Sequence, residues 1–377
     1  MSDKERKMRW DPYVFSRSER FTAFWQNHLG GEARNVLIIA GLGFDPRAND
    51  AAEALLNFGG KGRRDAWILC YDNDQLTTTE QQAVVSTNAE AFERLFASPG
   101  TIEKLQIAMR SDRGRSTTCS NTKAAVSRPT DLQRYDDVIV DVSAMPRMIA
   151  LMAVAQLLAL FDEWTHKGTN APNLHVVASE SVAHDLGVAE ESLDEEVTSV
   201  IGFSGRLGAE SLDNPKIWIP VLGEGQELRL SRIYNKLQPD EICPVVPFPS
   251  RNPRRGDGIV EEHRQILFDE FQVEPRNILY ASEYNPFEAY RQVFQAIDRY
   301  RAALVELDDC RIFVSPLSTK LLSIGALLAC YDHREQRNGH FHVGMPYVET
   351  AAYGPFRPIS AADRELTSMW LTGEWER

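Results

Sequence analysis

The chain has few cysteines, no long apolar run and no excess of positive charge. Its five cysteines are widely spaced, odd in number and form no CxxC pair, so the sequence predicts neither a disulfide framework nor a zinc knuckle and favours a reducing compartment. The formal net charge is −13, which argues against broad attraction to nucleic acid or to an anionic membrane. Any nucleotide site must therefore be a local basic pocket.

Segments that would take the chain to or across a membrane are also missing. The N-terminal residues carry charges with no apolar stretch after them, and the longest apolar helix that the sequence predicts, 148–161, is too short to span a bilayer. We therefore expect a cytoplasmic protein without a membrane partner.

Common motifs for phosphate, nucleotide and metal binding are not found in the sequence. The turn GLGFDPR has two glycines, but Pro46 occupies the third glycine position of a GxGxxG fingerprint, and GxxxxGK[ST] is absent. There is no HExxH, and although His340 and His342 alternate along an expected strand, two histidines on one face are weak grounds for a metal. The sequence therefore predicts no metal site and identifies no cofactor.

The sequence does contain a repeated alternation of apolar runs and helical stretches. NVLIIAGLGFDPR, AWILCYDND and DDVIVDVSAMPR each read as a buried strand that ends in a polar turn, and a helical stretch follows each of them. Such alternation indicates a mainly parallel sheet flanked by helices. At 377 residues the chain is too long for one ordinary core. We predict an α/β protein with two tandem Rossmann-like halves: an N-terminal helical extension (1–34), a first domain (35–200) and a second domain (201–377).

The two halves contain similar segments. DVIVDVSAMPRMIALMAVAQLLAL and CRIFVSPLSTKLLSIGALLAC each have an apolar strand, then Ser, Pro and a basic residue in the turn, then an apolar helix. The spacing differs, since Arg147 lies four residues after Ser143 whereas Lys320 lies five after Ser315. The likeness fits duplication of one unit and also fits chance similarity between two Rossmann-type units.

Residues 109–134 are unusually basic for this acidic chain. They contain six arginines or lysines against only two acids, and the stretch is polar and irregular. Such a composition is typical of a long loop, so we expect a mobile lid or a solvated insertion here.

Candidate ligand-binding residues lie in the turns that follow the expected strands. In an open parallel sheet the carboxyl ends of the strands share one edge, where helix N-termini offer free N–H groups and a positive dipole end. Glycines there let a phosphate approach the backbone, hydroxyls donate hydrogen bonds and basic side chains add charge. A structural alternative is that the glycines allow a tight turn and Asp45 caps the next helix. The candidates of the first half are Gly41, Gly43, Asp45, Arg47, Asp141, Ser143 and Arg147.

In the second half the turn best suited to an anion is SPLSTK, with three hydroxyls and a lysine, where a helix cap alone would need one hydroxyl. PFPSRNPRRGD adds three arginines, which fit either an anion gate or a solvated surface. SEYNP would place Glu283 and Asn285 on a base or ribose edge, or else start a helix with Asn285 as N-cap. The candidates of the second half are Arg251, Arg254, Arg255, Glu283, Asn285, Ser315, Ser318, Thr319 and Lys320.

These turns resemble those of a known family. A small polar loop after an early strand, with a later Ser-Arg or Ser/Thr-Lys turn entering an apolar helix, resembles the CRISPR-associated Rossmann-fold (CARF/SAVED-like) sensor domain. The tandem pair is similar to fused relatives that sense cyclic oligonucleotides in bacterial antiviral defence. The resemblance implies an effector protein as a partner. It also implies a first ligand loop with Gly43 and Asp45, and a second one with Ser143, Met145 and Arg147 in one half and Ser318, Thr319 and Lys320 in the other.

Three functions fit these observations. The first is a nucleotide-sensing or nucleotide-handling protein of a prokaryotic defence or stress system, able to form homo-oligomers. Lys320, Arg147 and the arginines at 251–255 would hold the phosphate of the ligand. The second is an enzyme acting on a nucleotide or sugar phosphate, with Asp45, Asp141 or Glu283 as acid–base group. The third is a non-catalytic scaffold subunit of a defence complex. We favour the first, with a nucleotide as the ligand.

Overall fold

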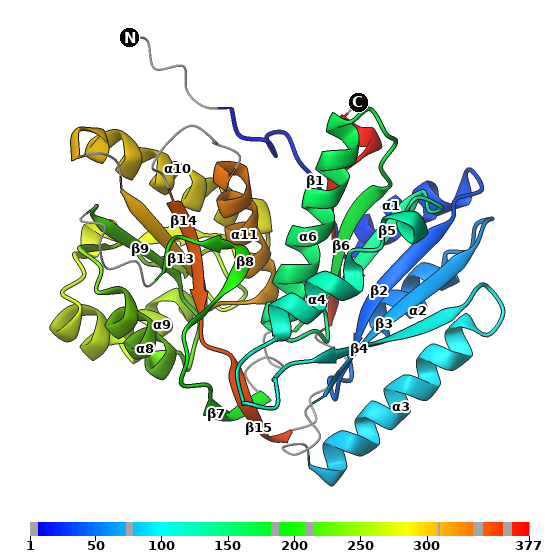
Figure 1. Ribbon diagram of the computed structural model, residues 1–377, viewed down its shortest axis with the longest axis horizontal. Coiled ribbons are helices and arrows are strands. Elements are labelled where there is room, and N and C mark those ends of the chain that lie inside the picture. Colours follow the sequence, from blue (N-terminus) through cyan, green and yellow to red (C-terminus); the bar gives the residue numbers. More distant parts are fainter. Residues whose placement is uncertain are drawn as a thin grey trace. The chain divides into compact units, whose positions relative to one another are not determined.

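The computed structural model in Figure 1 describes residues 7–72, 78–181, 188–207, 214–307, 310–334, 342–356 and 364–376. The chain divides into two compact units: a first unit of Tyr13–Glu191 and Ala352–Arg377, and a second unit of Met1–Pro12 and Ser192–Ala351. Each unit contains one large, mainly parallel sheet flanked by helices. The predicted fold class, α/β with two Rossmann-like halves, is confirmed.

The sheet of the first unit has seven strands in the order β1-β16-β6-β5-β2-β3-β4. Strands β2 to β6 run parallel, and β16 and β1 add antiparallel strands at one edge. All residues of β5 and six of the seven in β2 are buried, which explains their continuous apolar sequences. The strands are β1 (Val14–Arg17), β2 (Val36–Leu42), β3 (Arg64–Asp72), β4 (Ile102–Ala108), β5 (Asp137–Asp141), β6 (Asn173–Glu180) and β16 (Glu365–Thr372).

Helices cover both faces of this sheet. One apolar core joins α1, α2 and α3 to one face through residues such as Trp25, Leu55 and Phe92, and α4 packs against α6 on the other face (Figure 1). The helices are α1 (Glu19–Gly30), α2 (Asp50–Asn57), α3 (Thr79–Phe96), α4 (Thr118–Val126), α5 (Pro129–Leu132) and α6 (Arg147–His166).

The sheet of the second unit has the order β12-β11-β9-β13-β14-β8, with the short β10 paired to β9. All pairs are parallel except β14 with β8. The strands are β8 (Thr198–Ser204), β9 (Lys216–Val221), β10 (Glu241–Ile242), β11 (Val245–Pro247), β12 (Leu279–Ala281), β13 (Arg311–Pro316) and β14 (His342–Tyr347). The helices are α8 (Glu227–Leu237), α9 (Arg255–Glu262), α10 (Pro286–Leu304) and α11 (Lys320–Arg334). A separate two-stranded sheet pairs β7 (Val188–Leu193) with β15 (Thr350–Phe356).

The two large sheets have the same strand order. If the five parallel strands on the main path of each sheet, which leaves out β10, are numbered along the chain, both sheets read 3-2-1-4-5, with an antiparallel strand beside the fifth. This is the Rossmann order. The switch point lies between β2 and β5 in the first unit and between β9 and β13 in the second. The similar segments seen in the sequence are the fourth strand and the helix after it, β5 with α6 and β13 with α11. Because this order is common to Rossmann folds, it fits both duplication and an independent origin of two Rossmann-type units.

The units do not follow the domain boundaries 1–34, 35–200 and 201–377 expected from the sequence. Strand β16, from the C-terminal end of the chain, pairs with β6 of the first unit, and β1 pairs with β16. Helix α1 also belongs to that unit, since Phe21 and Trp25 are buried in its core. The pairing with β16 satisfies the N–H and C=O groups of β6, which would otherwise form an exposed edge.

The expectation of a long loop at residues 109–134 is wrong. This segment contains α4 and α5, and α4 packs against α6. The buried side chains of α4 include Cys119, Thr122 and Val126, which recur at about one helical turn. Because two of these are small or polar, the apolar periodicity that would predict a helix is weak in the sequence.

One helix of the described chain, α6, is long and apolar enough to cross a membrane by length and composition. It has 20 residues, Arg147–His166, whereas the sequence predicted only 148–161. However, 78% of its most apolar 18-residue window is buried inside the protein. A helix that is apolar on nearly all sides and buried on nearly all sides is typical of a domain core.

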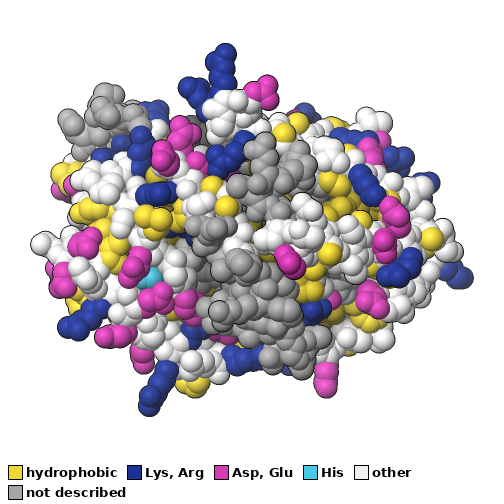
Figure 2. Space-filling view, turned by 90° about the horizontal axis from the view of Figure 1, so that it is seen from below, with side chains coloured by type: hydrophobic (Ala, Val, Ile, Leu, Met, Phe, Trp, Pro, Cys, Tyr) yellow, Lys and Arg dark blue, Asp and Glu magenta, His cyan; other side chains and the backbone are white. Residues whose placement is uncertain are grey.

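The surface seen in Figure 2 carries acidic and basic side chains interspersed with one another. No extended field of Lys and Arg gathers among the described residues of that face. A surface of this kind does not favour broad binding of nucleic acid there.

Candidate functional site

Glycines at the switch point of the first unit allow two loops to pack together. A Cβ atom on Gly41 would lie 2.8 Å from Cγ of Met145, and one on Gly43 would lie 2.2 Å from the hydroxyl oxygen of Tyr71. The Tyr71 hydroxyl donates a 2.6 Å hydrogen bond to the carbonyl of Ala144. The loops after β2 and β5 therefore touch, and neither glycine position tolerates a side chain without movement.

Arg47 and Asp45 form a buried ion pair in the loop after β2. Nη2 of Arg47 lies 2.7 Å from Oδ2 of Asp45, and Nη1 donates a 3.2 Å hydrogen bond to the carbonyl of Ser179. Arg47 is 2% exposed. Asn88 donates to the carbonyls of Gly43 and Asp45, at 2.8 and 2.9 Å. The sequence assigned Arg47 to a phosphate, whereas the structure places its guanidinium in contacts that fix the loop.

Asp141 and Ser143 form a closed turn after β5. The backbone N and Oγ of Ser143 donate to Oδ1 of Asp141, at 2.9 and 2.5 Å. Oγ of Ser143 in turn accepts a 2.7 Å hydrogen bond from the backbone N of Ser179. All three residues are buried. This network ties the end of β5 to the end of β6 and uses the hydroxyl that the sequence assigned to a ligand.

Two of the three hydroxyls in the SPLSTK turn have structural partners. Oγ of Ser315 accepts a 2.9 Å hydrogen bond from the indole of Trp218. Oγ1 of Thr319 accepts a 3.3 Å hydrogen bond from a backbone N–H in the first turn of α11, so Thr319 acts as the cap of that helix. Ser318 is 4% exposed, and Lys320, at the first position of α11, is partly exposed.

Arg255 joins the loops at the ends of three strands in the second unit. Its Nε and Nη2 atoms donate to the two carboxylate oxygens of Glu224 at 2.7 and 2.8 Å, and Nη1 lies 2.9 Å from Oε2 of Glu283. Glu283 also accepts a 3.2 Å hydrogen bond from the backbone N of Arg251. Glu224 follows β9, Arg255 follows β11 and Glu283 follows β12. The cluster therefore fixes this edge of the sheet.

The loop from β11 to α9 is held from within while two of its arginines face solvent. Oγ of Ser250 donates a 2.7 Å hydrogen bond to the carbonyl of Asn252, and Oδ1 of Asn252 accepts a 3.1 Å hydrogen bond from the backbone N of Arg254. Arg251 and Arg254 are exposed. Of the three arginines in PFPSRNPRRGD, Arg255 is thus part of the protein's own ion-pair network and the other two lie at the surface.

Exposed aromatic rings lie close to this loop. Phe248, which precedes Arg251 by three residues, is 51% exposed, and Tyr280 of β12 is 53% exposed. Their ring centroids are 6.0 Å apart at an interplanar angle of 76°. An exposed ring beside arginines offers a stacking surface for a planar group together with charge for a phosphate.

Asn285 starts a helix. Its Oδ1 atom accepts a 3.0 Å hydrogen bond from the backbone N of Phe287, and Pro286 occupies the first position of α10. The structural alternative for SEYNP is confirmed, and the side-chain oxygen of Asn285 is used as an N-cap.

The Arg255 cluster predicts a dependence of stability on pH. Burial alone would raise the pKa of Glu224, but the hydrogen bonds and charge of Arg255 outweigh it and hold that pKa below its usual value. The stabilisation is therefore complete above the pKa of an unfolded Glu, about 4.3, and is lost as the pH falls toward the folded pKa.

We expect wild-type protein to lose stability more steeply between pH 6 and pH 3.5 than an Arg255→Met variant, in which the main group that holds the pKa of Glu224 down is gone. Urea unfolding at a series of pH values measures this slope. Parallel slopes for the two proteins would contradict the assignment.

Arg147 and Lys320 occupy equivalent places in the two units. Each is the first residue of the helix that follows the fourth parallel strand, α6 or α11. Neither helix has an acidic residue in its first turn. In the sequence, Arg147 and Lys320 lie at different distances from Ser143 and Ser315. When the two segments are aligned on the first residue of the helix, the two basic residues coincide.

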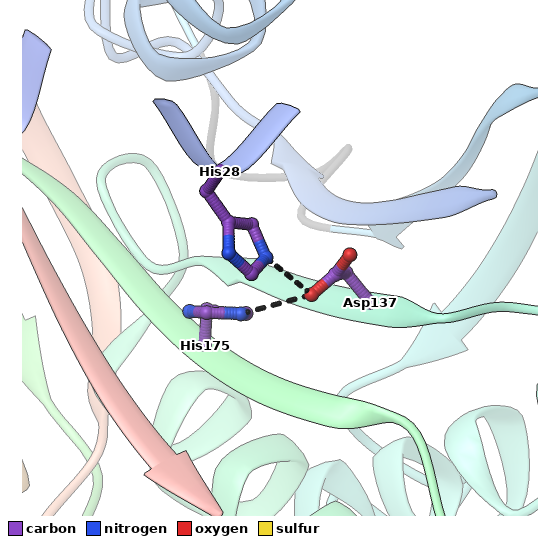
Figure 3. A group of neighbouring side chains, drawn as sticks. All are labelled: His28, Asp137 and His175. Atoms are coloured by element: carbon purple, nitrogen blue, oxygen red, sulfur yellow. Dashed lines mark hydrogen bonds and ion pairs between the residues drawn. The ribbon is translucent and has the colours of Figure 1, made fainter. Parts of the chain in front are cut away.

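A buried polar cluster at the opposite edge of the first sheet was not predicted from the sequence. Figure 3 shows His28 of α1 and His175 of β6 both pointing at Asp137, the first residue of β5. Nε2 of His28 lies 2.8 Å and Nε2 of His175 3.2 Å from Oδ1 of Asp137. Arg34 and Asn173 donate to the same carboxylate at 3.2 and 2.9 Å.

The electrostatics of this cluster favour an ionised aspartate. Burial alone would raise the pKa of Asp137, but hydrogen bonds from His175 and His28 outweigh it and hold the pKa far below its usual value. Burial lowers the pKa of His175, although Asp137 opposes that shift. The group of His28, Asp137 and His175 could also hold a metal ion, since one ligand atom from each lies within 4.8 Å of the others.

No short sequence motif predicts this cluster, because His28 is more than one hundred residues away from Asp137 and His175 in the sequence. The available signal is weaker: Asp137 and His175 are ionisable residues near the starts of two buried strands, where an unpaired polar group would be costly. The histidines considered from the sequence fall elsewhere. His340 lies outside the described residues, and the side chain of His342 is not described.

The candidate residues thus form two sets, one at the strand ends of each unit. Arg147 belongs to the first unit, whereas Lys320, Arg251 and Arg254 belong to the second. The chain matches no protein-family model, and no curated protein is significantly similar to it in sequence. Its function has to be inferred from the chemistry of these loops.

Proposed function

We propose that the protein binds a phosphorylated, nucleotide-type ligand at the carboxyl ends of its parallel strands. One observation carries the proposal: Arg147 and Lys320 open the two switch-point helices, α6 and α11. The N-terminus of a helix is the positive end of its dipole, so a cation there costs about 0.3–1 kcal/mol. A bound anion is attracted both by the helix end and by the cation.

Most other helices of the described chain support that reading. An acidic residue lies in the first turn of α1, α2, α3, α8, α9 and α10, although α4 has none. Helix α9 also opens on a basic residue, Arg255, but Glu224 and Glu283 neutralise it from within the protein. At the start of α9 a cation at a helix end is thus matched by carboxylates, which shows that such an arrangement can hold an anion.

A nucleotide fits better than inorganic phosphate because aromatic and basic groups occur together at the strand ends of the second unit. Phe248 directly follows β11 and precedes Arg251 by three residues, and its exposed ring contacts the exposed ring of Tyr280 on the neighbouring strand β12. Base stacking on an aromatic ring contributes roughly 1–3 kcal/mol. We assign Phe248, Tyr280, Arg251 and Arg254 to the base and phosphate of the ligand.

Binding is favoured over acid–base catalysis at these loops. The three carboxylates considered as catalytic groups, Asp45, Asp141 and Glu283, accept hydrogen bonds from Arg47, Ser143 and Arg255, respectively. Each is buried and holds a loop in place. A carboxylate fixed in this way stabilises the site rather than exchanging protons with a substrate.

We propose that the protein is a cytoplasmic nucleotide sensor or nucleotide-handling protein of a prokaryotic defence or stress system. Its resemblance to CRISPR-associated Rossmann-fold sensors motivates this setting. A sensor of that kind acts on a partner effector. Ligand binding would signal to the effector by changing the relative populations of two conformations of the sensor.

The proposal predicts that a nucleotide raises the melting temperature. At one hundred times its dissociation constant a ligand stabilises the native protein by about 2.7 kcal/mol. We expect a thermal shift with at least one member of a panel of mono-, di- and cyclic nucleotides. The shift should weaken in Arg147→Ala or in Lys320→Ala, because each removes the cation beside a helix end.

Lys236→Ala is the matched control, since Lys236 is an exposed lysine in the last turn of α8. It should respond to the nucleotide as the wild type does. The scaffold alternative predicts no shift with any nucleotide. A full shift in both Arg147→Ala and Lys320→Ala would exclude these residues from the site. Product formation from a nucleotide would move the protein into the enzyme class.

A further inference from the structure

We propose that His28, Asp137 and His175 form a binding site for a borderline divalent metal ion such as Zn²⁺. The three side chains come from α1, β5 and β6 and converge in Figure 3, with both imidazoles presenting Nε2 to the same carboxylate oxygen. Two histidines and one carboxylate are a ligand set that binds Zn²⁺ and related ions and leaves a further position for water.

The spacing of the donor atoms suits such an ion. Donors about 2.1 Å from a zinc ion are at most about 4.2 Å from one another, and those of the cluster already lie within 4.8 Å of one another. Small movements of the imidazoles suffice to close the site. On binding, Nε2 of each histidine gives its lone pair to the metal and the ring carries its proton on Nδ1, so a neutral imidazole changes tautomer without releasing a proton.

The contacts of the Asp137 carboxylate suit a ligand that binds a metal through one oxygen. Oδ1 of Asp137 faces the two imidazoles, whereas Oδ2 accepts a 3.2 Å hydrogen bond from Arg34. Asn173, itself held by the backbone N of Glu374 at 2.8 Å, donates to Oδ1. Outer contacts of this kind orient the ligands of a metal site.

Aromatic rings surround the imidazoles. The ring centroid of Trp25 is 4.8 Å and that of Trp370 is 5.0 Å from that of His175, and Phe24 stacks on His28 at 5.4 Å. An apolar shell lowers the local dielectric and strengthens metal–ligand bonds. The His28 side chain is 9% exposed and is the least buried of the three ligands.

One outer contact is missing. Nδ1 of His175 has no hydrogen-bond partner among the described residues, whereas a metal-bound histidine usually donates its second N–H to one. Loss of such a contact costs about 10–100-fold in affinity. We therefore expect reversible binding, removable by a chelator.

The site is independent of the proposed ligand site. Asp137 opens β5 and Asp141 ends it, so the cluster lies about 13 Å from the strand end, at a rise of about 3.3 Å per residue. Metal binding and nucleotide binding can therefore succeed or fail separately.

The test uses the full chain without a histidine tag, kept reduced and freed of metal with a chelator that is then removed. Zn²⁺ is added and the protein is separated by gel filtration for metal analysis, and Co²⁺ is titrated while the visible absorption of four-coordinate cobalt is followed. We expect one ion per chain, a rise in melting temperature with Zn²⁺, and loss of the Nε2–H signals of His28 and His175 in ¹⁵N NMR.

His28→Gln removes one ligand while its amide can still donate to Asp137. We expect it to weaken metal binding by more than about 100-fold, because loss of even an outer contact costs 10–100-fold. His166→Gln, which removes an exposed histidine of α6, should bind metal as the wild type does. Sub-stoichiometric metal in the wild type, or equal binding by wild type and His28→Gln, would overturn the proposal. An unchanged nucleotide response in His28→Gln would show that the two sites are separate.

Discussion

Replacing Arg255 with alanine is expected to lower the free energy of unfolding by about 3–5 kcal/mol. The guanidinium neutralises Glu224 and Glu283 through three hydrogen bonds of 2.7–2.9 Å. Removing it leaves two carboxylates in a cluster whose members are mostly buried, since the side chains of Arg255 and Glu283 are 7% and 6% exposed. Urea unfolding followed by the fluorescence of Trp218, in the same unit, measures the loss.

Arg254 provides the matched control. It is adjacent in the sequence, carries the same charge and is exposed, so Arg254→Ala should change the free energy of unfolding by no more than about 0.5 kcal/mol. A second comparison tests the cause. Adding Glu224→Gln and Glu283→Gln to Arg255→Met should restore much of the stability, because neutral amides need no cation. If it restores none, lost packing rather than unpaired charge is responsible.

Replacing Asp137 with alanine is expected to cost a similar amount, about 3–5 kcal/mol, in metal-free protein. Its carboxylate is fully buried. Four side chains then lose their acceptor: His28, Arg34, Asn173 and His175. Because Trp25 and Trp370 pack against the histidines, tryptophan fluorescence in a denaturant titration reports the change.

Asp136→Ala is the control for this variant. Asp136 is exposed and accepts one 2.7 Å hydrogen bond, from the backbone N of Asn35. Its loss should cost about 0.5–1.5 kcal/mol. Equal losses for the two variants would mean that burial and multiple donors add nothing at Asp137.

Local features of the fold were predictable from the sequence. The buried strands β2 and β5 are continuous apolar runs, because parallel strands are covered on both faces. Asn285 followed by Pro286 predicts a helix start, since the cap bonds to a backbone N–H two residues away. Such signals need only a few neighbouring residues, so they can be read along the chain.

Features that depend on distant partners were not predictable. β16 joins the first sheet because it completes the edge beside β6, and its other partner, β1, comes from the opposite end of the chain. The candidate Arg47 lies in a turn suited to a phosphate, but its guanidinium donates hydrogen bonds to Asp45 and to the carbonyl of Ser179. The burial of α4 was missed because Cys119 and Thr122, rather than large apolar residues, face the core.

By itself the sequence determined the class of the protein: two α/β halves, each with strands that end in polar turns. Only the tertiary structure decided which charges the protein neutralises internally. Arg254 and Arg255 are adjacent and chemically identical, but one is exposed and the other lies between two glutamates brought from separate strands. The reason is physical, because desolvation and ion pairing depend on distance in space, and the sequence specifies only distance along the chain.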